Sequence, residues 1–205
     1  MNAVIQAIRS RRSVRAYEDR PVPRELIETI IDAGNWAPTG NDEQRWRFVV
    51  VEGGVFRERL VNVTTPTFRK VMAAWTSIQD EFLRDYFVEM GPRCFGWPRV
   101  PFEELMTRLS RVPDGAYWDA PVIIFVIGPH SSECSLVCEN MMLAAQSLGL
   151  GSCMVGFGAM VMDDPEIVAA LEIRGADKIH GPIVFGYPRI VPEAPPKKPP
   201  VVKWI

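Results

Sequence analysis

The chain has 205 residues, of which 47% are hydrophobic and 23% charged, and its formal net charge is −2. This composition is typical of one globular domain with a sizeable core and excludes a disordered chain. The near-neutral charge balance also argues against a general nucleic-acid-binding protein, which carries an excess of basic residues.

The first predicted elements are two amphipathic helices with an arginine-rich segment between them. Apolar residues share one face of a short helix over 2–10, and the segment 11–17, RRSVRAY, follows it. A second helix is predicted over 22–38, with Gly34 in the left-handed conformation that closes many helices. The β-branched run 47–54, which ends in two glycines, predicts the first strand.

Residues 55–118 differ in composition from the rest of the chain, because they are rich in aromatic residues and bounded by Pro and Gly. Apolar residues recur at helical spacing from Trp75 to Met90, and the stretch 91–101 is expected to end that helix. A further helix is predicted over 102–109. Core packing accounts for most of these aromatic residues, and a minority is expected to line a ligand cleft. The candidates for stacking on a ligand or gating its entry are Trp75, Phe82, Tyr86, Phe95 and Trp97.

The second half of the chain alternates strands and helices, and this order predicts a sheet layered by helices. The predicted elements are a strand at 120–128, a helix at 131–151, a strand at 152–157, a helix at 163–173 and a strand at 181–188. The helix at 131–151 is apolar almost all round and is expected to be deeply buried. The proline-rich tail 191–205 cannot form a packed element alone, and its apolar end favours docking on another surface.

Several simple features indicate the compartment and exclude some partners. Arg9, Arg11 and Arg12 interrupt any apolar run at the start, so no secretory signal is expected. The longest apolar run, 120–128, is less than half of the roughly 20 residues that a membrane-spanning helix needs. Four cysteines and two histidines lack the paired spacing of a metal site, so buried free thiols are expected. We therefore expect a cytoplasmic protein with no metal, no nucleic-acid partner and no membrane partner.

The arginine-rich segment is the main candidate for ligand chemistry. The guanidinium groups of Arg11, Arg12 and Arg15, with the Ser13 hydroxyl, form a plausible phosphate cradle, and a solvated basic patch is the alternative. The chain lacks a Walker loop and a G-x-S-x-G elbow, and GLGSCM at 149–154 lacks the third glycine of a dinucleotide fingerprint. No acid, base or nucleophile set is evident, so no catalytic residue is assigned. A bound redox cofactor would supply the missing chemistry itself.

Three motifs in order resemble the nitroreductase family of FMN oxidoreductases. They are IRSRRSVRAYEDRPVPRELIETIIDAGNWAPTGNDEQRWRFVVVE, CENMMLAAQSLGLGSCMVGF, and GPIVFGYP followed by a lysine-bearing tail. The match covers roughly 4–53 and 120–200. The resemblance implies an α+β fold, a three-layer α-β-α sandwich whose central, mainly antiparallel sheet is flanked by helices. It also implies a homodimer with the C-terminal tail exchanged and each flavin at the subunit interface. Residues 1–205 would form a single FMN-binding domain, with a helical substrate-cover insertion at about 55–118.

The resemblance also implies which residues hold the flavin. The FMN phosphate would be held by Arg11, Arg12, Ser13 and Arg15, with further contacts from the tail residues Lys197 and Lys198. The isoalloxazine ring would be touched by Pro38, Thr39 and Gly40, with Asp42 and Gln44 close by, and approached by the backbone of Val155 and Gly156. A glycine at 156 suits such an approach, because it has no Cβ.

The function implied is an NAD(P)H-dependent oxidoreductase. Hydride from NADH or NADPH would pass through flavin N5 to a small flat acceptor such as a nitroaromatic or a quinone. Related flavin chemistry, reductive dehalogenation or flavin fragmentation, is one alternative, and a non-catalytic flavin-binding module is another. Asp42 stands where the family often has Asn, Arg45 replaces a proline, and Pro199 replaces a common arginine, which leaves the second alternative open.

Overall fold

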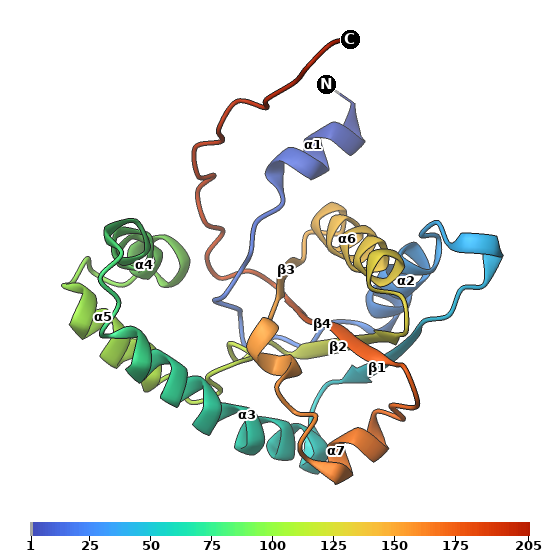
Figure 1. The fold of residues 1–205 in the computed structure, drawn as a ribbon, viewed down its shortest axis with the longest axis horizontal. Helices are drawn as coiled ribbons and strands as arrows, with labels where there is room; N and C mark the ends of the chain where they lie inside the picture. Colours follow the sequence, from blue (N-terminus) through green and yellow to red (C-terminus); the bar gives the residue numbers. More distant parts are fainter. Residues whose placement is uncertain (1) are drawn as a thin grey trace.

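A four-stranded sheet lies between two layers of helices in the computed structural model, which describes residues 2–205 (Figure 1). The elements in chain order are α1 (Ala3–Ser10), α2 (Arg24–Asn35), the 3-10 turn η1 (Gly40–Asp42), β1 (Arg47–Val51), α3 (Gly54–Trp75), α4 (Glu81–Phe95), α5 (Phe102–Ser110), β2 (Val122–Gly128), α6 (Ser131–Ser147), β3 (Gly151–Met154), the 3-10 turn η2 (Gly156–Ala159), α7 (Pro165–Ala170) and β4 (Lys178–Gly186). The strand order is β1-β2-β4-β3, and every neighbouring pair is antiparallel.

The central strand β2 is buried along its whole length, because helices cover both faces of the sheet. Side chains of a strand alternate between the two faces. Ile123, Phe125 and Ile127 pack in the core shared with α3 and α7. Val122 and Ile124 pack in the core shared with α2 and α6. This arrangement confirms the three-layer α-β-α sandwich and its antiparallel sheet.

The close packing of α2 on α6 explains why position 34 is a glycine. Gly34 lies inside α2 and has no left-handed φ, so the prediction that it closes the helix was wrong. A Cβ built at Gly34 would lie 2.6 Å from Cγ of Met141 on α6. A glycine is therefore needed here because the two helices approach each other closely.

The block 55–118 forms its own core beside the sheet, built from α3, α4 and α5. The apolar spacing predicted one helix from Trp75 to Met90, but the chain turns after Trp75, and the Asp80 side chain accepts a hydrogen bond from Leu83 N (2.9 Å) at the start of α4. The helix does end within the predicted stretch 91–101, but only at Phe95, with a left-handed Gly96 after it. A local pattern could not show this, because tertiary packing holds the last turn of α4 against α5.

Strand and helix ends differ modestly from the predicted ranges. The strand predicted at 47–54 ends at Val51, because Gly54 already begins α3. The strand predicted at 152–157 ends at Met154, and the chain then enters η2. All four cysteines are buried free thiols, as predicted.

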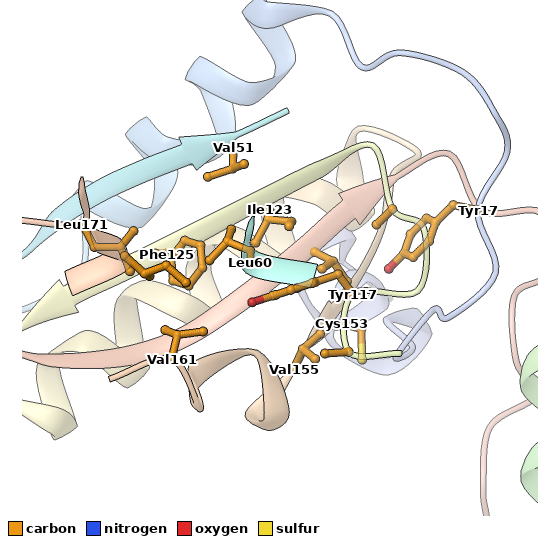
Figure 2. Close-up of a cluster of buried hydrophobic side chains, with 14 of the residues drawn as sticks. Tyr17, Val51, Leu60, Tyr117, Ile123, Phe125, Cys153, Val155, Val161 and Leu171 are labelled. Atoms are coloured by element: carbon orange, nitrogen blue, oxygen red, sulfur yellow. The ribbon is translucent and has the colours of Figure 1, made fainter. Parts of the chain in front are cut away.

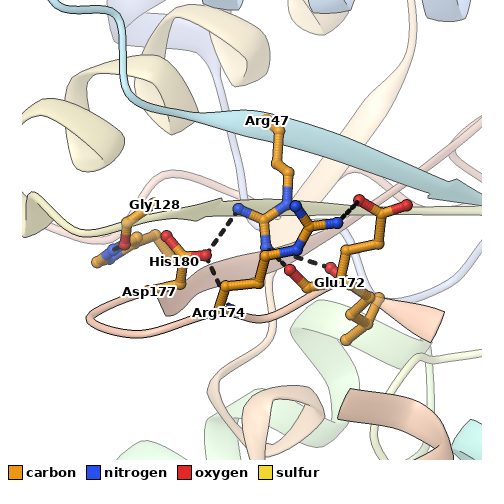
Figure 3. A network of polar contacts seen from close by, with 7 residues as sticks. Arg47, Gly128, Glu172, Arg174, Asp177 and His180 are labelled. Atoms are coloured by element: carbon orange, nitrogen blue, oxygen red, sulfur yellow. Dashed lines mark hydrogen bonds and ion pairs between the residues drawn. The ribbon is translucent and has the colours of Figure 1, made fainter. Parts of the chain in front are cut away.

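Arg47, at the start of β1, fastens the loop between α7 and β4 to the sheet (Figure 3). Its guanidinium donates to Asp177 Oδ2 (2.9 Å) and to the Leu171 carbonyl (3.3 Å). Burial opposes ionisation of Asp177, but hydrogen bonds from the Arg174 backbone and from Arg47 outweigh it, so the pKa of Asp177 lies below its usual value. These hydrogen bonds tie the loop between α7 and β4 to β1.

Both ends of the chain extend away from the sheet on the same side (Figure 1). None of the eight residues of α1 is buried, and Val4 is 63% exposed. The tail beyond Pro192 is exposed throughout, with Trp204 at 91%, so the docking predicted for it does not occur on its own chain. Within residues 2–205, no helix is both long and apolar enough to cross a bilayer.

The helix α6 is buried on one side only, which differs from the all-round burial predicted for it. Its inner face lies in the core, whereas Leu136 is exposed. Leu143 and Ala144, with Val4 of α1, line a groove of about 340 Å³ between α1, α2 and α6. Helix α6 thus carries more apolar side chains than packing within one chain buries.

Candidate functional site

The arginine-rich segment runs beside β3 after the chain leaves α1. Val14 N donates to the Ser152 carbonyl (3.0 Å), and Ser13 forms a parallel bridge with Ser152. The buried Tyr17 hydroxyl donates to the Val14 carbonyl (2.7 Å). These contacts fix the backbone of the segment against the edge of the sheet.

The three guanidinium groups of this segment have different partners. Arg11 lies 3.7 Å from Glu139 Oε1 on α6. Arg12 donates back to the carbonyls of α1's last turn and of Arg11. Arg15 turns inward and donates to the Ser13 carbonyl (3.2 Å) and to Cys94 Sγ (3.7 Å). Only Arg15 of the three therefore reaches the interior of the site.

Arg15 lines a cavity of about 230 Å³ together with the end of β3 and the start of η2, residues 153–157. The structure thus brings together Arg15, predicted to contact the flavin phosphate, with Val155 and Gly156, predicted to approach the flavin ring. A Cβ built at Gly156 would meet no heavy atom within 4 Å, so open space faces this backbone. Aromatic walls complete the cavity, formed by Phe68, Trp75, Tyr86, Phe87, Trp118 and Phe157.

Two of the five aromatic candidates, Trp75 and Tyr86, line this cavity. Phe95 and Trp97 stack on each other, with ring centroids 4.5 Å apart. They line a larger, charged hollow of about 800 Å³ that shares Arg15 and Trp118 with the first. Phe82 is 74% exposed and lines neither cavity in the part of the chain that the structure describes.

Several wall residues were not predicted. Phe68 lies seven positions before Trp75 on α3, and this helical spacing could have revealed it. Phe157 packs edge-on against Phe68, with centroids 5.3 Å apart. Trp118 adopts a left-handed φ of 60°, which no sequence pattern indicates for a tryptophan.

The turn at residues 38–44, which is predicted to contact the flavin ring, is held in place by α6. Glu133, in the first turn of α6, accepts hydrogen bonds from Gly40 N (2.9 Å) and from the Thr39 hydroxyl (3.1 Å). The Gly40 amide lowers the pKa of Glu133, and the Thr39 hydroxyl and His130 act in the same direction. Glu133 therefore anchors this turn as a carboxylate, a role that only the fold reveals.

The turn itself is preformed and exposed. Asn41, Asp42 and Gln44 all have left-handed φ values, between 48° and 56°. Such values are uncommon outside glycine and persist where the surrounding contacts over-determine them. Gln44 donates to Asp42 Oδ1 (2.6 Å) and, through its backbone, to the Thr39 hydroxyl (3.2 Å), while Pro38 is exposed.

The two halves of the predicted site lie far apart within one chain. Gly40 is bound at Glu133, whereas Ser10 is bound by Gln146 (3.3 Å) near the other end of the same helix. Thirteen positions of α-helix correspond to about 20 Å, and Figure 1 shows η1 and the 11–15 segment on opposite sides of α6. The tail residues Lys197 and Lys198 are exposed and, within residues 2–205, line neither cavity.

A family model described as the nitroreductase family matches residues 8–187. The chain belongs to the nitroreductase family. This membership confirms the resemblance that the three sequence motifs indicated. A relative from Methanothermobacter thermautotrophicus, whose name pairs NADH dehydrogenase with NAD(P)H nitroreductase, is 30% identical over 153 residues. That match covers 75% of this chain and 60% of the relative's length.

Two solved structures of this family share the fold over the full chain. A nitroreductase with bound FMN from Bacteroides fragilis is 25% identical, with a TM-score of 0.68 and complete coverage of both chains. An FMN- and NADPH-dependent nitroreductase, NfnB, from a Sphigopyxis strain is 23% identical, with a TM-score of 0.72 and coverage of 100% and 99%. The nitroreductase fold of this chain is therefore confirmed.

Proposed function

We propose that this protein is an FMN-dependent oxidoreductase that takes electrons from NADH or NADPH and reduces a small flat acceptor. The observation that carries the proposal is the meeting of Arg15, Val155 and Gly156 at one aromatic-walled cavity in a nitroreductase-family chain. FMN, when bound, supplies the acceptance and delivery of hydride at its N5 atom. We propose that residues 1–205 act as one FMN-binding domain.

The residues present fit this cofactor. The open space in front of Gly156 lets a flat ring approach the main chain, because no heavy atom of residues 2–205 lies within 4 Å of where its Cβ would be. The Arg15 guanidinium lies at the cavity wall, where a fixed positive charge stabilises negative charge that develops on a reduced ring. Arg11, Arg12 and Ser13, next along the segment, lie outside the cavity wall and are proposed to hold the phosphate.

We propose that the site is completed by a second copy of the chain. The turn at 38–44, also proposed to contact the ring, lies about 20 Å along α6 from Ser10 in the same chain. The exposed apolar residues of α1 and α6 and the unpacked tail mark a surface that one chain leaves uncovered. A homodimer with exchanged tails would cover it and bring Lys197 and Lys198 to a phosphate.

The helical block 55–118 is proposed to cover the flavin and to select the acceptor. Residues of this block, five of them aromatic, form more than half of the cavity lining, and flat aromatic molecules such as nitroarenes or quinones suit such a wall. We keep the cytoplasm as the proposed compartment, because all four cysteines are free thiols, as a reducing environment favours.

A reduction experiment tests the function directly. Protein purified without added cofactor is expected to be yellow, and NADPH or NADH should bleach it in the absence of oxygen. A nitroarene should restore the colour, whereas a halogenated phenol should not. Colourless protein that fails to take up FMN would contradict the cofactor assignment. Yellow protein that neither nicotinamide bleaches would contradict the proposed reaction.

A further inference from the structure

Tyr117 is a fully buried tyrosine, with an exposed fraction of 0%, in the core beneath the proposed flavin-contacting turn. Figure 2 shows its side chain beside Val155 and Val161 in this core. Its hydroxyl donates to the carbonyl of Gly158 in η2 (3.0 Å). Burial, followed by the neighbouring Asp114, raises the pKa of Tyr117 above its usual value, so the hydroxyl keeps its proton. A buried residue without a catalytic position thus donates to the turn that forms the cavity floor.

The turn after β3 is held on two sides. Gly158 N donates to the Val155 carbonyl (3.0 Å), and Val155 N donates to the Pro182 carbonyl (2.8 Å). A Cβ at Gly158 would lie 2.5 Å from Cε1 of Tyr117 and 2.6 Å from Cγ of Pro182. The turn is therefore wedged between the Tyr117 ring and β4, and a shift of either side would move Val155 and Gly156.

Tyr117 is held in place by the backbone turn at residues 114–119, which contains two left-handed residues. Its backbone N–H donates to the Asp114 carbonyl (2.8 Å), and the Asp114 carboxylate lies 2.9 Å from the Arg57 guanidinium. The next two residues, Trp118 and Asp119, both have left-handed φ values of 60° and 53°. Such conformations persist only where surrounding contacts enforce them, and they gather at functional sites. The same turn places the Trp118 ring in the cavity wall.

We propose that Tyr117 is a positioning residue, whose hydrogen bond to Gly158 sets how closely the Val155–Gly156 backbone approaches the flavin ring. This inference rests on the proposed function. Tyr117 touches neither cofactor nor substrate, and it acts through η2. Its influence falls on the ring side of the site, because the phosphate segment is held separately by Tyr17 at Val14.

The test compares Tyr117→Phe with the intact protein. The variant keeps the ring that wedges Gly158 and leaves the buried Gly158 carbonyl without its donor. We expect the dissociation constants for FMN and for riboflavin to rise by the same factor, about threefold to tenfold, because the loosened Val155–Gly156 backbone makes poorer contact with the ring, a loss on the scale of one hydrogen bond. The midpoint potential of the bound flavin should fall, because backbone groups that stabilise charge on the reduced ring lie farther from it.

Two further variants control the comparison. Tyr187→Phe removes a hydroxyl that has no hydrogen-bond partner within residues 2–205, while the ring stays under Arg20 (3.7 Å), and it should change neither affinity nor potential. Tyr117→p-aminophenylalanine restores an N–H donor at the same place and should return both quantities toward the original values. Should Tyr117→Phe not fold, Asp114→Asn carries the comparison, since it removes the charge of the ion pair that ties the same turn to Arg57 and leaves the Tyr117 ring intact.

The outcomes separate this inference from the proposed function. If the unmodified protein binds neither FMN nor riboflavin, the proposed function fails and the inference with it. If it binds both, and the substituted protein matches it in affinity and midpoint potential, the inference alone is overturned. A loss confined to FMN would place the effect at the phosphate and would overturn it as well.

Discussion

Replacing Arg15 with alanine is expected to lower the affinity for FMN by about tenfold to a hundredfold, because a charge-assisted hydrogen bond contributes roughly 1.5–3 kcal/mol. Arg15 is the one guanidinium of its segment at the cavity wall, beside Val155 and Gly156. Its other contacts are one hydrogen bond to the Ser13 carbonyl (3.2 Å) and a longer one to Cys94 Sγ (3.7 Å). Titration of the purified apoprotein with FMN, followed by flavin fluorescence, measures the effect.

Arg69→Ala is the matched control for Arg15→Ala. Arg69 is an exposed arginine whose Nε donates to the Ser110 carbonyl (3.1 Å), outside both cavities. The Arg69→Ala protein should bind FMN as tightly as the unmodified protein. Arg15→Lys keeps the charge without the planar fork and should fall between the two. Equal affinities in the two alanine variants would remove Arg15 from the cofactor site.

Deleting residues 193–205 is expected to convert the proposed dimer into a monomer and to abolish retention of FMN during purification. Every residue of this tail is exposed, so the deletion removes no packing within the chain and should change the free energy of unfolding of the monomer little. The apolar end of the tail, with Trp204 and Ile205, is instead available to a second copy. Sedimentation velocity at micromolar concentration measures the change in mass.

A second variant separates the two roles of the tail. Lys197→Gln combined with Lys198→Gln keeps the apolar end and removes the charges proposed to face a phosphate. This variant should remain dimeric and bind FMN more weakly. A truncated protein that still sediments as a dimer would show that the tail does not hold the two copies together.

The elements with a regular local pattern could be predicted from the sequence. The continuous apolar run of β2 and the aspartate–proline start of α7 both correspond to the observed elements. Helix ends controlled by tertiary contacts could not be predicted in this way. Gly34 serves the contact with Met141 on another helix, and α4 continues past Gly91 because it packs on α5.

The same distinction applies to the candidate site. Arg15, Val155 and Gly156 were predicted from motifs, and the structure places them at one cavity. Glu133 and Tyr117 were missed, because each acts on a residue far away in the chain: Glu133 on Thr39, and Tyr117 on the turn at Gly158. Nothing in the local sequence indicates such partners, so residues that position a site are found only when the fold is known.

Each flavin is proposed to be held by Arg15 of one copy and by the 38–44 turn of another. Arg15→Ala and Gly40→Leu proteins, each expected to bind FMN at least about tenfold more weakly on its own, can be unfolded together, refolded as a mixture and titrated at FMN concentrations that fill only intact sites. Shared sites predict that half of the dimers are hybrids with one intact site, so about a quarter of all sites should bind FMN again. If no binding returns although hybrid dimers form, both groups belong to one chain's site and the shared site is contradicted.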